Sequence, residues 1–231
     1  MKIIKILTLF NLIHHKINIK HKKIRNKIIN IIKNNNNSLY DYGEGFFYQS
    51  IPLINLKGLR DTDRRIEELK LNNYLKDSEF LDIGTNIGAI PLSVKNQFKY
   101  CIGIDHSDTV IKVAKTVKEY LNLKNIKFIC ADFLKYKFDR NFDVILSLAN
   151  HSTFDQGIKD SDDYFKKIYS LLKDNGFLIL ESHSPYYESN EKFLKVVNNF
   201  IGSFKIVNKG IYNFGNYYDS GRTYLILKKL K

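Results

Sequence analysis

The chain has 231 residues, which is enough for one domain with a sizeable hydrophobic core and a short extension. Its two cysteines, Cys101 and Cys130, are too few for a disulfide framework or for a metal site built from thiolates. Both fall in predicted strands, so we expect buried, reduced thiols and a cytoplasmic protein. The net charge of +13 raises the question of a polyanionic partner.

Most of this positive charge lies near the N-terminus. Residues 1–37 contain eight lysines, one arginine and no acid, whereas residues 38–231 contain 28 basic and 24 acidic residues. Lys, Asn, Ile, Tyr and Phe are all abundant, as an A/T-rich genome would favour. We therefore attribute the excess charge to genome composition more than to selection for nucleic-acid binding.

Residues 1–33 combine basic side chains with apolar ones at roughly helical spacing. No apolar run approaches the ~20 residues that a bilayer crossing needs. One interpretation is a basic amphipathic helix that contacts a membrane surface or RNA. The other, which we favour, is one or two helices that pack on the domain or lie loosely beside it. The polar run Asn34–Asn37 predicts a boundary between an extension at 1–38 and a domain at 39–231.

Residues 39–60 are rich in aromatic residues and glycine and have no regular period. The segment is too apolar for a solvated linker, so we expect an ordered loop that packs over the core. Thr62 is the predicted N-cap of a helix that runs from Asp63 to about Leu75.

From residue 79 onward, strands and helices alternate. Strands are expected at about 79–83, 99–105, 126–130, 142–148, 177–181, 204–210 and 222–229, and helices at about 87–97, 108–121, 162–173 and 190–200. Gly176 is the predicted C-cap of the third of these helices. Apolar strands between amphipathic helices indicate an α/β fold, with a mostly parallel sheet covered on both faces. Only a loop separates the last two strands, which predicts a terminal antiparallel hairpin.

A glycine turn follows the strand at 79–83, with the pattern Asp-x-Gly-x-Asn-x-Gly at residues 82–88. The free N–H groups at the start of a helix and two glycines without side chains suit a nucleotide-like ligand. The dinucleotide fingerprint Gly-x-Gly-x-x-Gly is absent, because Asn86 replaces the middle glycine and no third glycine follows. An acid, Asp82, ahead of this shorter turn suits a ligand with a charged amino acid end and no pyrophosphate.

The order of these motifs resembles that of the class I S-adenosylmethionine-dependent methyltransferases, over about residues 62–231. The resemblance implies a seven-stranded Rossmann-like sheet and S-adenosylmethionine as the cofactor. It also implies that Asp82, Gly84, Asn86 and Gly88 form the family's first cofactor-binding motif.

The resemblance assigns further cofactor contacts to the ends of the next strands. Asp105, with His106 beside it, would hold the ribose hydroxyls. Asp132 would bind the adenine amino group and Phe133 would pack on the adenine ring. Leu148 would line the pocket for methyl transfer. In some family members a segment ahead of the first strand closes over the cofactor, and here Tyr48 and Arg60 occupy that segment. Plain packing of a connecting segment remains an equal alternative for them.

The acceptor side is expected where the fourth and fifth parallel strands end, at His151, Glu181 and His183. One histidine would be a general base, since an unperturbed imidazole has a pKa of about 6.5. Two alternatives stay open: the three side chains hold a metal ion, or they only cap strand ends. The end of the fourth strand lacks the Asn/Asp-Pro-Pro-aromatic motif of the branch that methylates adenine or glutamine amines.

We therefore expect a methyltransferase that acts on an oxygen or nitrogen atom of a small molecule or carbohydrate. An RNA methyltransferase with a basic N-terminal arm is the second hypothesis, and a non-catalytic binding module is the third. The sequence does not indicate an oligomeric state.

Overall fold

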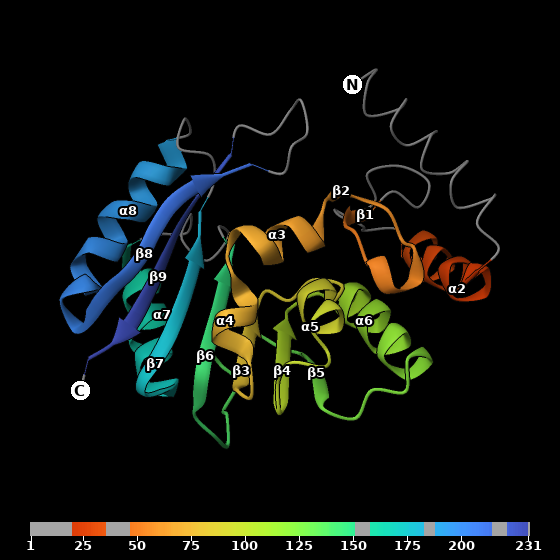
Figure 1. Ribbon diagram of the computed structural model, residues 1–231, viewed down its shortest axis with the longest axis horizontal. Coiled ribbons are helices and arrows are strands. Elements are labelled where there is room, and N and C mark those ends of the chain that lie inside the picture. The colour runs from red at the N-terminus through yellow and green to blue at the C-terminus, as the bar shows by residue number, and fades with distance from the viewer. Residues whose placement is uncertain (1–19, 36–46, 151–157, 183–187, 214–220, 231) are drawn as a thin grey trace.

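The computed structural model of the protein describes residues 20–35, 47–150, 158–182, 188–213 and 221–230 (Figure 1). Its main sheet contains β3 (Glu79–Ile83), β4 (Tyr100–Asp105), β5 (Ile126–Cys130), β6 (Phe142–Leu148), β7 (Leu172–Glu181), β8 (Phe204–Tyr212) and β9 (Arg222–Lys229). A small second sheet contains β1 (Phe47–Gln49) and β2 (Gly58–Arg60). The helices in the described ranges are α2 (Lys22–Lys33), α3 (Thr62–Glu68), α4 (Leu71–Leu75), α5 (Ala89–Ser93), α6 (Asp108–Tyr120), α7 (Ile158–Leu171) and α8 (Glu188–Phe200), with short 3₁₀ turns η1 (Pro52–Ile54) and η3 (Ile201–Ser203).

The seven strands lie in the order β5-β4-β3-β6-β7-β9-β8. The first five are parallel to their neighbours, whereas β9 is antiparallel to both β7 and β8. Figure 1 shows the β8–β9 hairpin at one end of the sheet and α2 beside α6 at the other. The expected α/β fold with a terminal hairpin is confirmed.

Alternate side chains of each central strand enter two separate core layers. In β3, Phe80 joins the layer on the side of α2 to α6, and Leu81 joins the layer on the side of α7 and α8. Because both faces of the parallel strands are covered, the polar side chains gather where the strands end. The carboxyl ends of β3, β4, β6 and β7 therefore define the candidate site.

The segment between β2 and β3 differs from its prediction. Asp61, and not Thr62, caps α3, because the Asp61 carboxylate accepts hydrogen bonds from the backbone N–H groups of Asp63 and Arg64. The expected single helix is divided into α3 and α4, since Lys70 takes a left-handed conformation with φ of 50°. Thr62 instead joins the helix to the loop before it, through hydrogen bonds with Ser50.

Two helix ends were also predicted wrongly. Helix α5 ends at Ser93, and the backbone N–H of Gln97 donates to the carbonyl of Val94 instead of to that of Ser93. Helix α7 ends at Leu171, and Gly176 lies inside β7 rather than capping a helix.

Residues 47–60 are ordered and packed, as expected for this part of the aromatic segment. Phe47, Ile51, Ile54 and Leu56 are fully buried, and β1 pairs in parallel with β2. Residues 39–46 lie outside the described part of the chain.

Helix α2 packs on the domain through one apolar face. Ile24, Ile28 and Ile32 are buried, and the Arg25 guanidinium donates a hydrogen bond of 3.1 Å to the carbonyl of Ile54. The favoured interpretation, a helix packed on the domain, is confirmed for residues 20–35. The boundary near residue 38 stays a prediction. Within the described ranges, no helix is both long enough and apolar enough to cross a membrane.

The two cysteines differ in their surroundings. Cys101 is buried in the central strand β4, as expected. Cys130 is exposed, which contradicts the prediction. It lies at the end of β5, and β5 forms the edge of the sheet, so no further strand covers it.

Candidate functional site

The turn after β3 contains three residues in the left-handed region, with φ of 68° at Gly84, 53° at Asn86 and 72° at Gly88. Glycine adopts this conformation without strain, and asparagine tolerates it better than most other residues. The backbone N–H groups of Gly84 and Thr85 both donate to the carbonyl of Ile104 in β4. The turn is therefore held against the neighbouring strand, and Asn86 satisfies its geometry without a third glycine.

The two glycines of the turn are also close to neighbouring side chains. A Cβ at Gly84 would overlap the side-chain amide of Asn150, which donates a hydrogen bond of 2.5 Å to the carbonyl of Ile83. A Cβ at Gly88 would lie 2.5 Å from Phe128 Cζ. Both positions thus require glycine for internal packing as well as for backbone conformation.

The backbone before Asn150 is strained. Ala149 has a φ of 59°, which is uncommon for a residue with a Cβ and costs roughly 1–2 kcal/mol. This conformation follows the last residue of β6 and precedes the side chain that contacts the glycine turn. Strain of this kind is often found at functional sites.

Asp105, at the end of β4, points back to the glycine turn. Its carboxylate accepts hydrogen bonds of 3.0 Å from the backbone N–H groups of Asn86 and Ser107. A carboxylate has about four acceptor positions, so these two bonds leave acceptor capacity for a ligand. His106 extends into solvent, with 72% of its side chain exposed and its Nδ1 3.7 Å from Asp105 Oδ1.

Asp82 is buried beneath the turn. Its carboxyl accepts a hydrogen bond of 2.7 Å from the hydroxyl of Thr85. Burial raises the pKa of Asp82 to about 7, although the Thr85 hydrogen bond and the positive charge of Arg65 oppose the shift. Asp82 thus holds the turn from below and titrates near neutral pH.

The remaining predicted cofactor residues lie around the glycine turn. Asp132 is about half exposed, and its carboxylate accepts a hydrogen bond from the backbone N–H of Leu134. Phe133 is buried against Phe138 and Tyr164, with ring centroids 6.0 and 5.2 Å away. This packing fixes the position of the Phe133 ring, and its contact with adenine stays a prediction. Leu148 is buried at the end of β6.

Glu181, at the end of β7, belongs to a buried charge network. Arg65 of α3 donates hydrogen bonds of 2.7 and 2.8 Å to its two carboxylate oxygens, and the Tyr212 hydroxyl donates one of 2.5 Å. Burial alone would lower the pKa of Arg65, but the adjacent Glu181 carboxylate holds this pKa above its ordinary value. Burial and the negative charge of Glu181 together raise the pKa of Tyr212. Arg65 thus stays charged and Tyr212 stays neutral over the ordinary pH range.

Arg222 extends this network to the segment before α3. Its guanidinium lies 3.9 Å from Glu181 and donates hydrogen bonds to the carbonyl of Ser182 and the hydroxyl of Tyr48. The guanidinium of Arg60 lies 5.9 Å from the centre of the Tyr48 ring. These contacts bring together Tyr48, Arg60 and Glu181. Arg65, the partner of Glu181, lies close enough to Asp82 to act on its charge.

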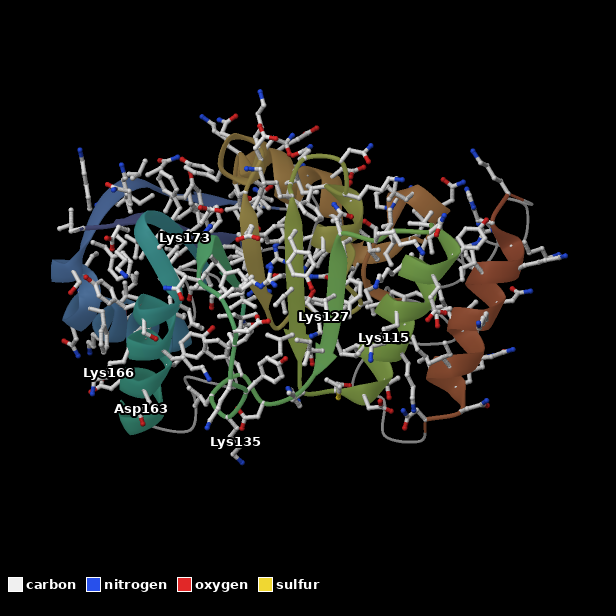
Figure 2. All side chains as sticks on the ribbon, turned by 90° about the horizontal axis from the view of Figure 1, so that it is seen from below. Lys115, Lys127, Lys135, Asp163, Lys166 and Lys173 are labelled. Carbon is white, nitrogen blue, oxygen red and sulfur yellow. The ribbon has the colours of Figure 1, made fainter. Side chains whose placement is uncertain are left out.

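His151 and His183 both lie outside the described residues. In the part of the chain that the structure describes, no group of three or more His, Cys, Asp or Glu side chains is arranged to hold a metal ion. A cavity of about 570 Å³ is found at the opposite end of the strands, near Lys173 (labelled in Figure 2), Glu79 and Asp143. Lys173 bonds to both carboxylates there, with distances of 3.1 to 3.3 Å. This cavity is remote from the glycine turn.

Sequence reasoning missed several members of the site. Tyr212 and Arg222 lie in the terminal hairpin, and only the fold brings them to the end of β7. Asn150 was visible as a polar residue just after an apolar strand. The sequence indicated the pairing of Arg65 with Glu181 only indirectly. A carboxylate at the end of a buried strand needs a cationic partner, but the sequence does not say which one.

The pKa of Asp82 predicts a dependence of stability on pH. Between about pH 4 and pH 7 the folded state keeps the Asp82 proton and the unfolded state loses it. The free energy of unfolding should then fall as pH rises, by up to about 1.4 kcal/mol per pH unit. Urea denaturation of the wild type and of Asp82→Asn at several pH values measures this. The difference between the two slopes isolates Asp82, and equal slopes would contradict its raised pKa.

Loss of Arg65 should destabilise the protein strongly, because it leaves the Glu181 carboxylate buried without its main partner. We expect Arg65→Met to lower the free energy of unfolding by about 3–5 kcal/mol. Arg64→Met is the matched control on the same helix, since Arg64 is 40% exposed and its contacts with Glu68 and Asn213 lie at the surface. Similar losses for both variants in chemical denaturation would refute a structural role for the buried pair.

Comparison with known proteins agrees with this geometry. A family model described as "Methyltransferase domain" matches residues 75–214. Carboxy-S-adenosyl-L-methionine synthase of Nautilia profundicola is 30% identical over 55% of this chain and 53% of its own length. A release factor glutamine methyltransferase of Fusobacterium nucleatum is 28% identical over 69% of this chain and 53% of its own. The chain thus spans about half the length of the curated relatives it matches.

Among solved structures, the N-methyltransferase NodS from Bradyrhizobium japonicum WM9, in complex with S-adenosyl-L-homocysteine, superposes with a TM-score of 0.62. It is 15% identical, and the match covers 73% of this chain and 87% of that one. At this identity the likeness concerns the fold. Together with the family model, which matches more than half of the sequence, it identifies the chain as a member of the methyltransferase-domain family, with the Rossmann-like fold of the S-adenosylmethionine-dependent enzymes.

Proposed function

We propose that the chain transfers the methyl group of S-adenosylmethionine to an oxygen or nitrogen atom of a small molecule or carbohydrate. The observation that carries the proposal is the contact of the Asp105 carboxylate with the backbone of the glycine turn. It joins a strand-end acid to the motif at residues 82–88, as the proposed cofactor site requires.

The residues present fit this cofactor. Asp105 keeps acceptor positions for the two ribose hydroxyls after it has accepted two backbone N–H groups. Asp82 is buried and contacts Thr85, so we expect its charge to act on the cofactor's ammonium group across the turn. Asp132 lies beyond the end of the neighbouring strand β5, where we expect the adenine amino group.

Bound S-adenosylmethionine supplies a methyl group on a positively charged sulfur. The protein must orient the acceptor atom, exclude water and remove a proton from that atom. Both carboxylate oxygens of Glu181 accept hydrogen bonds from Arg65, and Tyr212 adds a third, which favours a positioning role over a role as the base. His151 and His183 stay the candidates for the base from the sequence.

A small acceptor is favoured by the nearly balanced charge of residues 38–231, which hold 28 basic and 24 acidic residues. The names of the relatives do not define the acceptor, since one is a synthase of a modified cofactor and another methylates a protein release factor. The acceptor class is therefore proposed on the charge of this chain and not on its relatives.

An RNA methyltransferase is the second candidate, and the polar face of α2 favours it. Lys22, Lys23, Lys27 and Lys33 are exposed there, and α2 contains no acid. Lys115 of α6 and Lys127 of β5 extend from the same end of the sheet (Figure 2). RNA binding that weakens steeply with salt and disappears on deletion of residues 1–37 would favour this candidate.

Cofactor binding is tested by calorimetry with S-adenosylmethionine. We expect Asp105→Asn to weaken binding by about 10- to 100-fold, because hydrogen bonds to a charged group contribute about 1.5–3 kcal/mol. Asp108→Asn is the control, since Asp108 is an exposed acid that pairs with Lys112 at the start of α6. A wild-type protein that does not bind S-adenosylmethionine would instead support the non-catalytic module.

The base is tested by turnover of tritiated S-adenosylmethionine with nucleic-acid, carbohydrate and small-molecule fractions of a cell extract. If a histidine is the base, His151→Ala or His183→Ala should lower kcat by about 10²- to 10⁴-fold while cofactor binding is retained. The wild-type rate should rise with pH around 6.5. If both variants keep full turnover, neither histidine removes the proton.

A further inference from the structure

We infer that the hydroxyls of Ser182 and Thr223 form a binding site for an uncharged hydroxyl or amide group of the acceptor. The inference rests on the proposed methyltransferase function and names two residues that determine its substrate. Neither belongs to the cofactor-binding motif, and neither was a candidate from the sequence.

The two residues lie directly opposite each other at the end of β7 and the start of β9. Glu181 pairs with Tyr224, and the backbone N–H of Ser182 donates a hydrogen bond of 2.8 Å to the carbonyl of Thr223. Residues opposite each other in an antiparallel pair have Cβ atoms about 5 Å apart. One ligand group can therefore contact both hydroxyls.

Strand alternation places both side chains on the α7 and α8 side of the sheet. Leu180 and Leu225 belong to the core layer on that side, and Ser182 and Thr223 are two residues further along the same strands. The hydroxyls thus lie beyond the last apolar residues of this layer on these two strands. Glu181 points to the opposite face, where its carboxylate binds Arg65.

Both hydroxyls are buried and have no hydrogen-bond partner. Among the described residues, only a few side-chain polar atoms are in this state. Ser182 is fully buried. Burying an unpaired hydroxyl costs about 1–3 kcal/mol, so nearly all buried polar groups in folded proteins are paired. Two unpaired hydroxyls opposite each other at a strand end indicate that a ligand provides the missing bonds.

The nearest comparable hydroxyl is satisfied within the protein. Ser147, in the neighbouring strand β6, is also buried on this face, and its hydroxyl shares a hydrogen bond of 2.6 Å with that of Tyr164. A hydroxyl buried at this edge of the sheet can thus be paired within the protein, whereas the hydroxyls of Ser182 and Thr223 are not.

The position of the pair suits a part of the acceptor that does not react. Ser182 is two strands from β3 and its glycine turn, or about 10 Å at the usual strand spacing. A group held there orients the rest of the acceptor over the end of β6, towards the cofactor. Hydroxyls both donate and accept hydrogen bonds and carry no charge, so the complementary groups are hydroxyls or amides, as on a sugar ring.

The first test measures stability and needs no acceptor. Ser182→Ala and Thr223→Val remove hydroxyls that have no partner, so the melting temperature should rise by about 2–4 °C for each. Ser147→Ala is the control, because it removes a hydroxyl that is hydrogen-bonded to both Tyr164 and Asn150 and should lower the melting temperature. If Ser182→Ala lowers it as much as Ser147→Ala does, the hydroxyl is structural and the inference is refuted.

The second test measures turnover of tritiated S-adenosylmethionine with the small-molecule and carbohydrate fractions of a cell extract, after ion exchange. Wild-type activity should reside in the uncharged, unretained fraction. The double variant Ser182→Ala/Thr223→Val should raise the KM for that fraction by about 10-fold or more. Thr223→Ser, which keeps a hydroxyl, should retain the wild-type KM.

Calorimetry separates the two levels of the proposal. An unchanged Kd of the double variant for S-adenosylmethionine, together with a raised acceptor KM, supports the inference. Wild-type turnover with an unchanged KM in the double variant refutes the inference alone. A wild type that neither binds S-adenosylmethionine nor methylates any fraction refutes the proposed function, and the inference with it.

Discussion

The buried ion pair between Arg65 and Glu181 joins two parts of the chain that are 116 positions apart. Arg65 comes from the segment before the first strand of the main sheet, and Glu181 ends the last parallel strand. Removing both charges from water is costly, and the two hydrogen bonds between them, with a third from Tyr212, offset that cost. The pair thus fixes where α3 and the β1–β2 segment lie over the ends of the strands. The geometry of the neighbouring site depends on this placement.

The site has two halves with different physical character. Around β3 and β4, backbone N–H groups and two acids build a turn whose shape depends on left-handed residues. Around β7 and β9, side chains make the polar contacts, and the two faces of the sheet differ: the Glu181 carboxylate is fully engaged on one face, whereas Ser182 and Thr223 are unpaired on the other. A half with a defined backbone suits a constant cofactor, and a half made of side chains allows the acceptor to vary between relatives.

Much of the fold was predictable because it depends on local patterns. Apolar periodicity placed all seven strands of the main sheet, and the motif at residues 82–88 predicted the glycine turn after β3. The wrong predictions concern local features whose structure depends on contacts with residues distant in the sequence. Lys70 divides a helix, and Cys130 is exposed because β5 is the edge strand. The packing of Phe133 against Tyr164, a residue 31 positions later, was likewise not marked by any local pattern. The partners of Glu181 come from α3 and the terminal hairpin, and no local pattern marks such contacts.

The contact between Gly84 and the Asn150 amide has a consequence for the evolution of this protein. A methyl group at position 84 would occupy the space of that amide, and the amide in turn is bonded to the carbonyl of Ile83. Positions 84 and 150 are therefore not free to diverge independently. A descendant that replaces Asn150 with a bulkier residue must alter the turn after β3. Substitutions at the end of β6 are thereby limited to side chains that leave this space open.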